Sequence, residues 1–172
     1  YSPFLKQLVS RHPDWLEDLQ TSGRLEKTSP PTADLLTETI ERVGLDSALR
    51  QFRNREMMRL IWRDLTELAP VEEILEDLST LADVCLQAAV DHHTRVLEEK
   101  HGVPRSPEGE AQKLIVIGLG KLGGCELNLS SDVDIIFCYP DRGECDGRRG
   151  LSNEQFFTRL SRGVIRSLSE IT

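Results

Sequence analysis

Apolar residues recur at helical spacing through the first hundred residues of the chain. Prolines 3 and 13 stand where first-turn positions of two short helices are expected, and residues 21–32 are rich in turn-forming residues. Ser79 stands within a long apolar stripe and is a candidate cap for a second helix there. The pattern predicts helices over residues 3–10, 13–20, 33–43, 47–69 and 71–100.

The pattern changes after a polar linker that begins at Arg105. A β-branched run over residues 114–117 predicts one strand, and residues 133–139 predict a second. The second run is apolar on both faces, so we expect both of its faces to be covered. We therefore expect an α+β fold, with a helical region over residues 1–104 and a mixed region over residues 105–172.

The predicted strands are joined and followed by polar or glycine-rich segments. Residues 120–129 predict a turn with one helical turn, and residues 140–150 predict a loop. Ser152 with Gln155 three positions later predicts a capping box at the start of a last amphipathic helix. The helical pattern continues to Ile171 without a terminator, and residue 1 is not methionine, so we expect a fragment of a longer protein.

Two aspartates, Asp132 and Asp134, stand where the second apolar run begins. Side chains alternate along a strand, so both carboxylates are expected on one face, with Val133 on the other. Paired acids beside a glycine-rich turn suit a metal-dependent phosphoryl or nucleotidyl site, because such a turn lets phosphate approach backbone N–H groups.

Composition and charge limit the classes of protein to consider. The chain has a net charge of −8, with 38% hydrophobic and 29% charged residues, which is ordinary for a globular protein and unlike a general nucleic-acid or membrane-surface binder. Its four cysteines show no metal-ligand spacing and predict free thiols in a reducing compartment. No apolar run approaches bilayer length, so we expect a cytoplasmic protein with neither a membrane nor a nucleic-acid partner.

The glycine-rich segment allows two interpretations. Residues 118–123 fit GxGxxG after a strand, the pattern of a dinucleotide-binding oxidoreductase. That fold requires a crossover of a dozen or more residues, whereas residues 125–131 are all that separates Gly124 from Asp132. A glycine followed after twelve positions by Asp-x-Asp is instead similar to the DNA polymerase β type of nucleotidyltransferase.

A more specific resemblance covers most of the chain. GLGKLGGCELNLSSDVDIIF resembles the signature of the bacterial glutamine synthetase adenylyltransferase/adenylyl-removing enzyme family, and SRHPDWLEDL, LRQFRNREMMRLIW and DGRRGLSNEQFFTRL extend it. Members of that family carry two nucleotidyltransferase domains, one of which attaches AMP to a tyrosine of glutamine synthetase while the other removes it. Asn128 and the flanking segments resemble the adenylyl-removing half, and the adenylylating half, which transfers AMP from ATP, is the alternative.

The resemblance implies roles for particular residues. Asp132 and Asp134 would bind Mg²⁺ or Mn²⁺, and phosphate would attack AMP-tyrosine on adenylylated glutamine synthetase to give ADP. A third carboxylate is expected beyond residue 172, so we expect the chain alone to be poorly active. Regulation by a PII-type signal protein is expected of the whole enzyme. The residues expected to bind nucleotide or phosphate are Gly118, Gly120, Lys121, Gly123, Gly124, Ser130 and Ser131.

Two further groups of residues receive structural interpretations. The arginines of the fourth predicted helix are expected to form a solvated face, with their stems along the apolar stripe. His92 and His93 lack a partner at metal-ligand spacing and are expected at the surface. A noncatalytic helical scaffold that docks glutamine synthetase is the remaining alternative.

Overall fold

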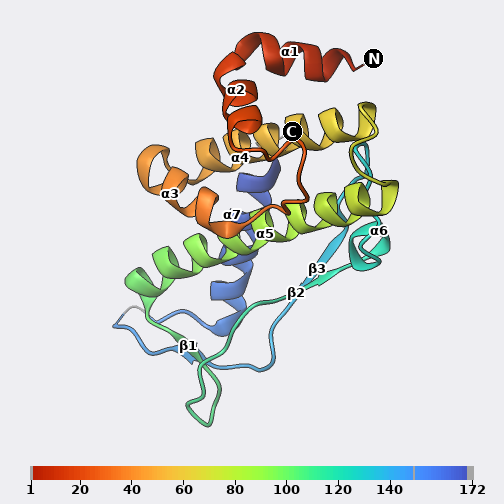
Figure 1. The fold of residues 1–172 in the computed structure, drawn as a ribbon. Helices are drawn as coiled ribbons and strands as arrows, with labels where there is room; N and C mark the ends of the chain where they lie inside the picture. Colours follow the sequence, from red (N-terminus) through yellow and green to blue (C-terminus); the bar gives the residue numbers. More distant parts are fainter. Residues whose placement is uncertain (1, 149, 170–172) are drawn as a thin grey trace.

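The computed structural model describes residues 2–148 and 150–169, and it is dominated by helices (Figure 1). The first five helices lie close to their predicted positions, and the hydroxyl of Ser2 caps the first by accepting a hydrogen bond from the N–H of Leu5. These helices are α1 Pro3–Arg11, α2 Pro13–Thr21, α3 Ala33–Val43, α4 Leu45–Leu65 and α5 Val71–His101. None of the helices over the described residues is long and apolar enough to cross a membrane.

Helix α5 is continuous over 31 residues, so the expected second start at Ser79 is wrong. The Ser79 hydroxyl donates to the carbonyl of Leu75, a helical bond that does not interrupt the helix. Ser79 is 2% exposed and faces the rest of the molecule. From this position the Ser79 side chain can also contact Leu127, a residue far away in the sequence.

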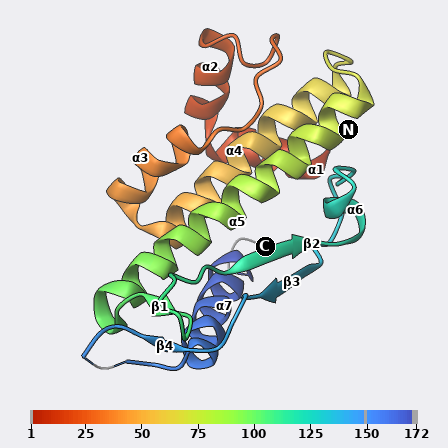
Figure 2. The ribbon, with the colours of Figure 1, turned by 90° about the horizontal axis from the view of Figure 1, so that it is seen from below.

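The mixed region contains two small antiparallel sheets, which confirms the α+β class. Strand β2 (Ile115–Gly118) pairs with β3 (Ile135–Cys138), so β3 begins two residues later than predicted (Figure 2). Strands β1 (Pro104–Arg105) and β4 (Glu144–Cys145) also pair, inside segments that were expected to be a linker and a loop. A two-residue strand is too short to show an alternation of apolar and polar residues, so the sequence pattern did not predict these strands.

The last helix, α7 (Asn153–Ser169), begins with the predicted capping box. The N–H of Gln155 donates to the Ser152 hydroxyl at 3.2 Å, and the N–H of Ser152 donates to the Gln155 side chain at 3.4 Å. Ile171, the predicted end of this helix, lies outside the described residues. Helix α7 packs along α5 and contributes Phe156, Phe157, Leu160 and Val164 to the core.

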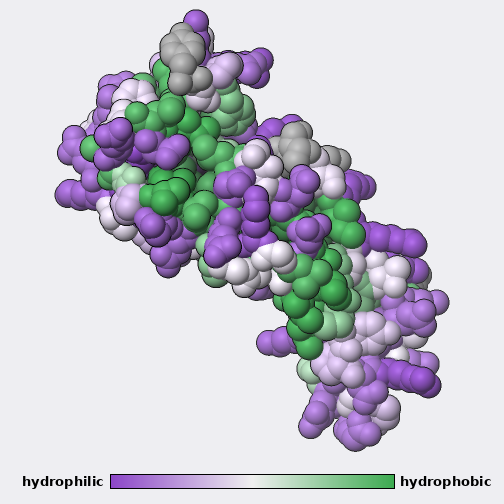
Figure 3. All heavy atoms as spheres, turned by 90° about the vertical axis from the view of Figure 1, so that its right-hand side faces the viewer, coloured by the Kyte–Doolittle hydropathy of each residue, from purple (hydrophilic) through white to green (hydrophobic). Residues whose placement is uncertain are grey.

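One large apolar core joins helices α4, α5 and α7 to one face of the β2–β3 sheet. Val116, Ile135 and Phe137 of the sheet pack against this core. The other sheet face is open among the described residues, because Ile115 and Ile117 are each 45% exposed and Ile136 is 48% exposed. The prediction that both faces of the second strand are covered is therefore wrong here. Figure 3 shows apolar side chains reaching the surface on one side of the molecule.

The arginines of α4 do not form the predicted solvated face. Arg59 is fully buried and bonds to Glu56 at 2.8 Å and to Asp77 at 2.7 Å. Arg63 is 1% exposed and bonds to Glu73 at 2.6 Å and to the carbonyl of Leu25 at 2.8 Å. These ion pairs and the hydrogen bond to Leu25, which we call the arginine network, join α4 to α5 and to the segment after α2. A second contact of that segment is the ion pair of Arg24 with Glu56.

Candidate active site

A tight turn connects β2 to the rest of the candidate site. It contains the four-residue helix α6 (Gly120–Gly123), which matches the predicted single helical turn. Gly120 has φ +53°, and a Cβ on Gly123 would lie 2.6 Å from the carbonyl oxygen of Gly118. These two positions therefore require glycine, the first for its backbone conformation and the second for close packing.

The other residues of this turn are less constrained. A Cβ on Gly124 would meet its nearest atom at 3.6 Å, an ordinary contact. Lys121 and Gly124 are exposed, while Gly118 is half-buried at the end of β2. The turn thus presents backbone and a lysine to solvent, and phosphate binding by Gly118, Gly120, Lys121, Gly123 and Gly124 stays a prediction.

The segment that carries the two aspartates, residues 127–134, is here called the acid loop. Its first residue, Leu127, is 4% exposed and is held to α5 by a hydrogen bond from its N–H to the Ser79 hydroxyl at 3.2 Å. This bond joins residues 48 positions apart. Ser79 therefore positions the loop, a role that sequence reasoning missed. The only signal was a hydroxyl on the apolar stripe of a helix.

Asn128 organises the next part of the acid loop. Its side-chain oxygen accepts hydrogen bonds from the N–H and hydroxyl of Ser130, at 3.1 and 3.2 Å, and from the hydroxyl of Ser131 at 2.9 Å. The Ser131 hydroxyl also accepts from the N–H of Asn128 at 3.0 Å. Such local bonds are typical of asparagine and serine turns. Both serine hydroxyls thus take part in holding the loop, and their expected contact with phosphate stays a prediction.

Asp132 and Asp134 follow at the end of the loop, and both are exposed. Because β3 begins only at Ile135, strand alternation does not govern residues 132–134, and Asp132 and Val133 line the same cavity. A Cβ on Gly120 would lie 4.0 Å from a carboxylate oxygen of Asp134, so that acid stands against the glycine turn. Asp134 also continues the sheet, since its carbonyl accepts from the N–H of Leu119 at 2.9 Å.

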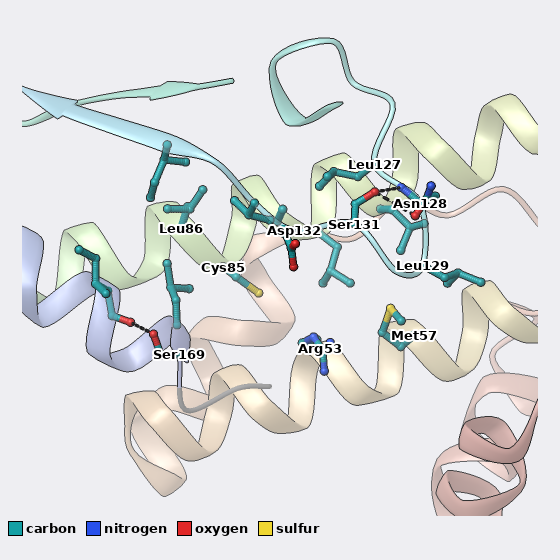
Figure 4. Close-up of a pocket in the computed structure, with 17 residues that line it drawn as sticks. Arg53, Met57, Cys85, Leu86, Leu127, Asn128, Leu129, Ser131, Asp132 and Ser169 are labelled. Carbon is teal, nitrogen blue, oxygen red and sulfur yellow. Dashed lines mark hydrogen bonds between the residues drawn. The ribbon is translucent and has the colours of Figure 1, made fainter. Parts of the chain in front are cut away.

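The cavity beside Asp132 lies between α4, α5, the acid loop and α7 (Figure 4). It has a volume of about 400 Å³. Arg53, which sequence reasoning placed on a solvated helix face, is one of its lining residues. Nothing in the local sequence distinguishes Arg53 from the neighbouring arginines, because the acid loop that completes the cavity is more than seventy positions away.

The described residues contain no cluster of three or more histidine, cysteine, aspartate or glutamate side chains able to hold a metal ion. Asp132 and Asp134 are the two carboxylates of the candidate site, and none of the ion pairs among described residues uses them. The four cysteines are free, and Cys85 lies buried in the wall of the cavity.

The topology around the glycine turn excludes the dinucleotide-binding alternative. Strands β2 and β3 pair directly and antiparallel, with Gly118 opposite Ile135, and the only helix between them has four residues. A dinucleotide fold needs parallel strands joined by a full crossover helix. A glycine turn followed by an Asp-x-Asp loop on an antiparallel hairpin is instead the arrangement expected of a nucleotidyltransferase core.

Comparison with known proteins agrees with this class. The family model described as glutamate-ammonia ligase adenylyltransferase matches residues 1–172. The chain is 42% identical over 177 residues to a bifunctional glutamine synthetase adenylyltransferase/adenylyl-removing enzyme of Thioalkalivibrio sulfidiphilus, with 99% of this chain covered. Proteins of the same description from Pseudomonas aeruginosa and Shewanella frigidimarina are 41% and 39% identical, also with 99% of this chain covered.

The chain therefore belongs to the glutamate-ammonia ligase adenylyltransferase family. It spans about 18% of the length of each of these three relatives. The expected resemblance is thus confirmed at the level of the family.

Proposed function

We propose that this chain supplies the glycine turn and two metal-binding carboxylates of the adenylyl-removing site of a bifunctional enzyme that acts on glutamine synthetase. The observation that carries the proposal is the placement of Asp134 against the glycine turn in a chain of this family, with Asp132 two residues away at a cavity. Asn128 and the segments that flank the site resemble the adenylyl-removing half, and this resemblance favours that half over the adenylylating half.

The donor set fits a divalent cation. Mg²⁺ prefers oxygen ligands and is usually held by one or two carboxylates, with waters and substrate phosphate completing its shell. Asp132 and Asp134 offer two exposed carboxylates, and exposure leaves room for those waters and the phosphate. When bound, Mg²⁺ or Mn²⁺ would neutralise phosphate charge and orient the attacking group.

The reaction needs little from the protein beyond placement. An oxygen of inorganic phosphate attacks the phosphorus of AMP-tyrosine, and the bond from phosphorus to the tyrosine oxygen breaks. ADP forms, and the proton of hydrogen phosphate ends on the tyrosine oxygen, which restores unmodified glutamine synthetase. The chain's own residues bind and orient the reactants: the glycine turn brings backbone N–H groups near phosphate, and the acid loop holds Asp132 in place.

The test uses the intact enzyme that carries this chain, adenylylated glutamine synthetase, phosphate and Mg²⁺, with ADP as the product measured. Asp132→Asn or Asp134→Asn should lower the rate of ADP formation by about 100-fold or more, since each removes a metal ligand. Asp64→Asn, at another exposed aspartate, is the matched control and should leave the rate unchanged.

Two results would contradict the proposal. Unchanged ADP formation in both site variants would remove these acids from the mechanism and favour a noncatalytic docking role. Loss of ATP-dependent adenylylation with intact ADP formation would assign the chain to the adenylylating half. Binding of glutamine synthetase should survive both substitutions. A PII-type signal protein is proposed to act through other parts of the enzyme.

A further inference from the structure

One face of the β2–β3 sheet carries apolar side chains that stay exposed in the described part of the chain. Ile115 and Ile117 of β2 are each 45% exposed, and Ile136 of β3 is 48% exposed. Ile117 pairs with Ile136 across the two strands, and Ile115 lies two residues along the same strand, so the three form one surface, here called the open face. Figure 2 shows both strands on the side of the molecule away from α3 and α4.

Isoleucine is unusual on a sheet face that stays in water. An antiparallel sheet with one solvated face normally alternates apolar and polar residues, whereas residues 114–117 are apolar without a break. Apolar patches with a polar rim mark surfaces that contact another protein. Lys113 and Lys121, both exposed, supply such a rim at the two ends of β2. The open face therefore has the character of an interaction surface.

The open face leads directly to the candidate site. Leu119, one residue past β2, keeps an extended backbone, with φ −112° and ψ 170°, and is 41% exposed. Its N–H donates to the carbonyl of Asp134 at 2.9 Å, so the pairing of the two segments continues as far as this acid. Asp134 precedes Ile136 by two positions, which is about 7 Å along an extended chain. A large molecule that brings a reacting group to Asp134 thus brings its own surface over Ile136 and Ile117.

We propose that the open face docks the protein substrate, adenylylated glutamine synthetase, through the surface that surrounds its modified tyrosine. The proposal rests on the proposed function, which supplies the substrate, and adds a binding surface outside the residues assigned to phosphate and metal. The occupant follows from position. A segment of the same enzyme held permanently on this face would also lie across the approach to Asp134, whereas a substrate protein covers the face only while it reacts.

The first test measures ADP formation by the intact enzyme at increasing concentrations of adenylylated glutamine synthetase. Ile117→Lys and Ile136→Lys place a charge in the contact, and each should raise KM by about 10- to 100-fold, as for a central residue of an interface. The kcat should stay within about twofold, because these side chains bind the substrate without touching the reacting atoms. Val71→Lys, at an apolar residue that is 58% exposed at the start of α5, is the matched control and should change neither constant.

The second test locates the contact by photocross-linking. The intact enzyme carries p-benzoylphenylalanine in place of Ile117 or Ile136 and is irradiated with adenylylated glutamine synthetase in the absence of phosphate, so that no turnover occurs. Mass spectrometry should find cross-links to glutamine synthetase in peptides next to the modified tyrosine. The same photoreactive residue in place of Val71 should give no such cross-link.

The outcomes distinguish this proposal from the proposed function. Cross-links only within the enzyme, or between two copies of it, would assign the open face to another occupant and overturn the docking proposal even if Asp132→Asn abolishes ADP formation. An unchanged KM in Ile117→Lys and Ile136→Lys, with or without a lower kcat, would also overturn it. Cross-links to glutamine synthetase with ADP formation unaffected by Asp132→Asn would support the docking surface and overturn the proposed function.

Discussion

The helical region and the acid loop are held in place by different kinds of contact. The arginine network fixes α4 through buried ion pairs and apolar contacts, with Arg59 fully buried. The acid loop is held by the Ser79 bond at one end and by local bonds to Asn128, and its aspartates are exposed. The contrast shows that the rigid part of this molecule and its candidate site are different segments, as is common where loops on a rigid scaffold carry function.

The largest effect on the free energy of unfolding is expected from a substitution in the arginine network. Arg59→Met removes a buried cation and leaves the carboxylate of Asp77, which is 4% exposed, without that partner. The free energy of unfolding should fall by about 3–5 kcal/mol, measured by urea denaturation.

The control for this change is Arg95→Met. Arg95 pairs with Glu99 at 3.4 Å, and both side chains are 65% exposed. An exposed pair of this kind contributes about 0.5 kcal/mol or less. Equal losses in the two variants would mean that burial of the arginine network adds nothing to stability.

The second prediction concerns the glycine turn that lies against the acid loop. Gly123→Ala places a methyl group 2.6 Å from the Gly118 carbonyl oxygen, so the turn must shift. We expect a stability loss of about 1–3 kcal/mol and ADP formation lower by about 10- to 100-fold, because the turn stands against Asp134. Thermal denaturation and the ADP assay measure the two effects.

Gly124→Ala is the matched control one residue away. Its methyl group meets an ordinary contact at 3.6 Å, and it should change stability by less than about 0.5 kcal/mol. The close-packing argument fails if the two alanine variants behave alike.

The smallest expected effect is a pH dependence of stability caused by His93, which lies where α5 packs on α7. Its ring nitrogen bonds to the Ser167 hydroxyl at 3.0 Å, and partial burial, followed by the nearby His92, lowers its pKa. Arg166 also lowers this pKa and Asp46 raises it. The folded protein therefore resists protonation more than the unfolded chain does, so stability should fall as the pH drops below about 6.5.

The measurement compares urea midpoints at pH 7.5 and pH 5.5 in wild type and in His93→Gln. Glutamine retains a polar group beside Ser167 but does not titrate, so the decline at low pH should be smaller in the variant. An equal decline in both proteins would assign it to other groups.

Local signals in the sequence predicted much of the fold. The capping box of Ser152 and Gln155 and the start of α1 at Pro3 depend on neighbours within a few residues, and both predictions are confirmed. The spacing from Gly120 to Asp132 favoured a nucleotidyltransferase for a similar reason, since a turn and an acid loop are short, and the resemblance of longer segments indicated the family. The roles of the acids and of the phosphate-binding residues stay predictions.

Three of the differences share one physical cause, which is contact between residues far apart in the chain. Arg59 is buried because Asp77 and Glu56 meet it, and an arginine in isolation gives no sign of that. Ser79 belongs to the site because Leu127 reaches it. The short strands β1 and β4 exist because Pro104 and Cys145 come together across the chain.

The bond between Ser79 and Leu127 has a consequence for the order of folding. It closes a segment of 48 residues, and the bond between His93 and Ser167 closes one of 74. Closing a long segment costs conformational entropy before any contact compensates for it, so such contacts form slowly. Helices α4 and α5 are neighbours in sequence and can associate early. The acid loop should therefore reach its place late, and refolding followed by hydrogen exchange should protect the N–H of Leu127 after those of α5.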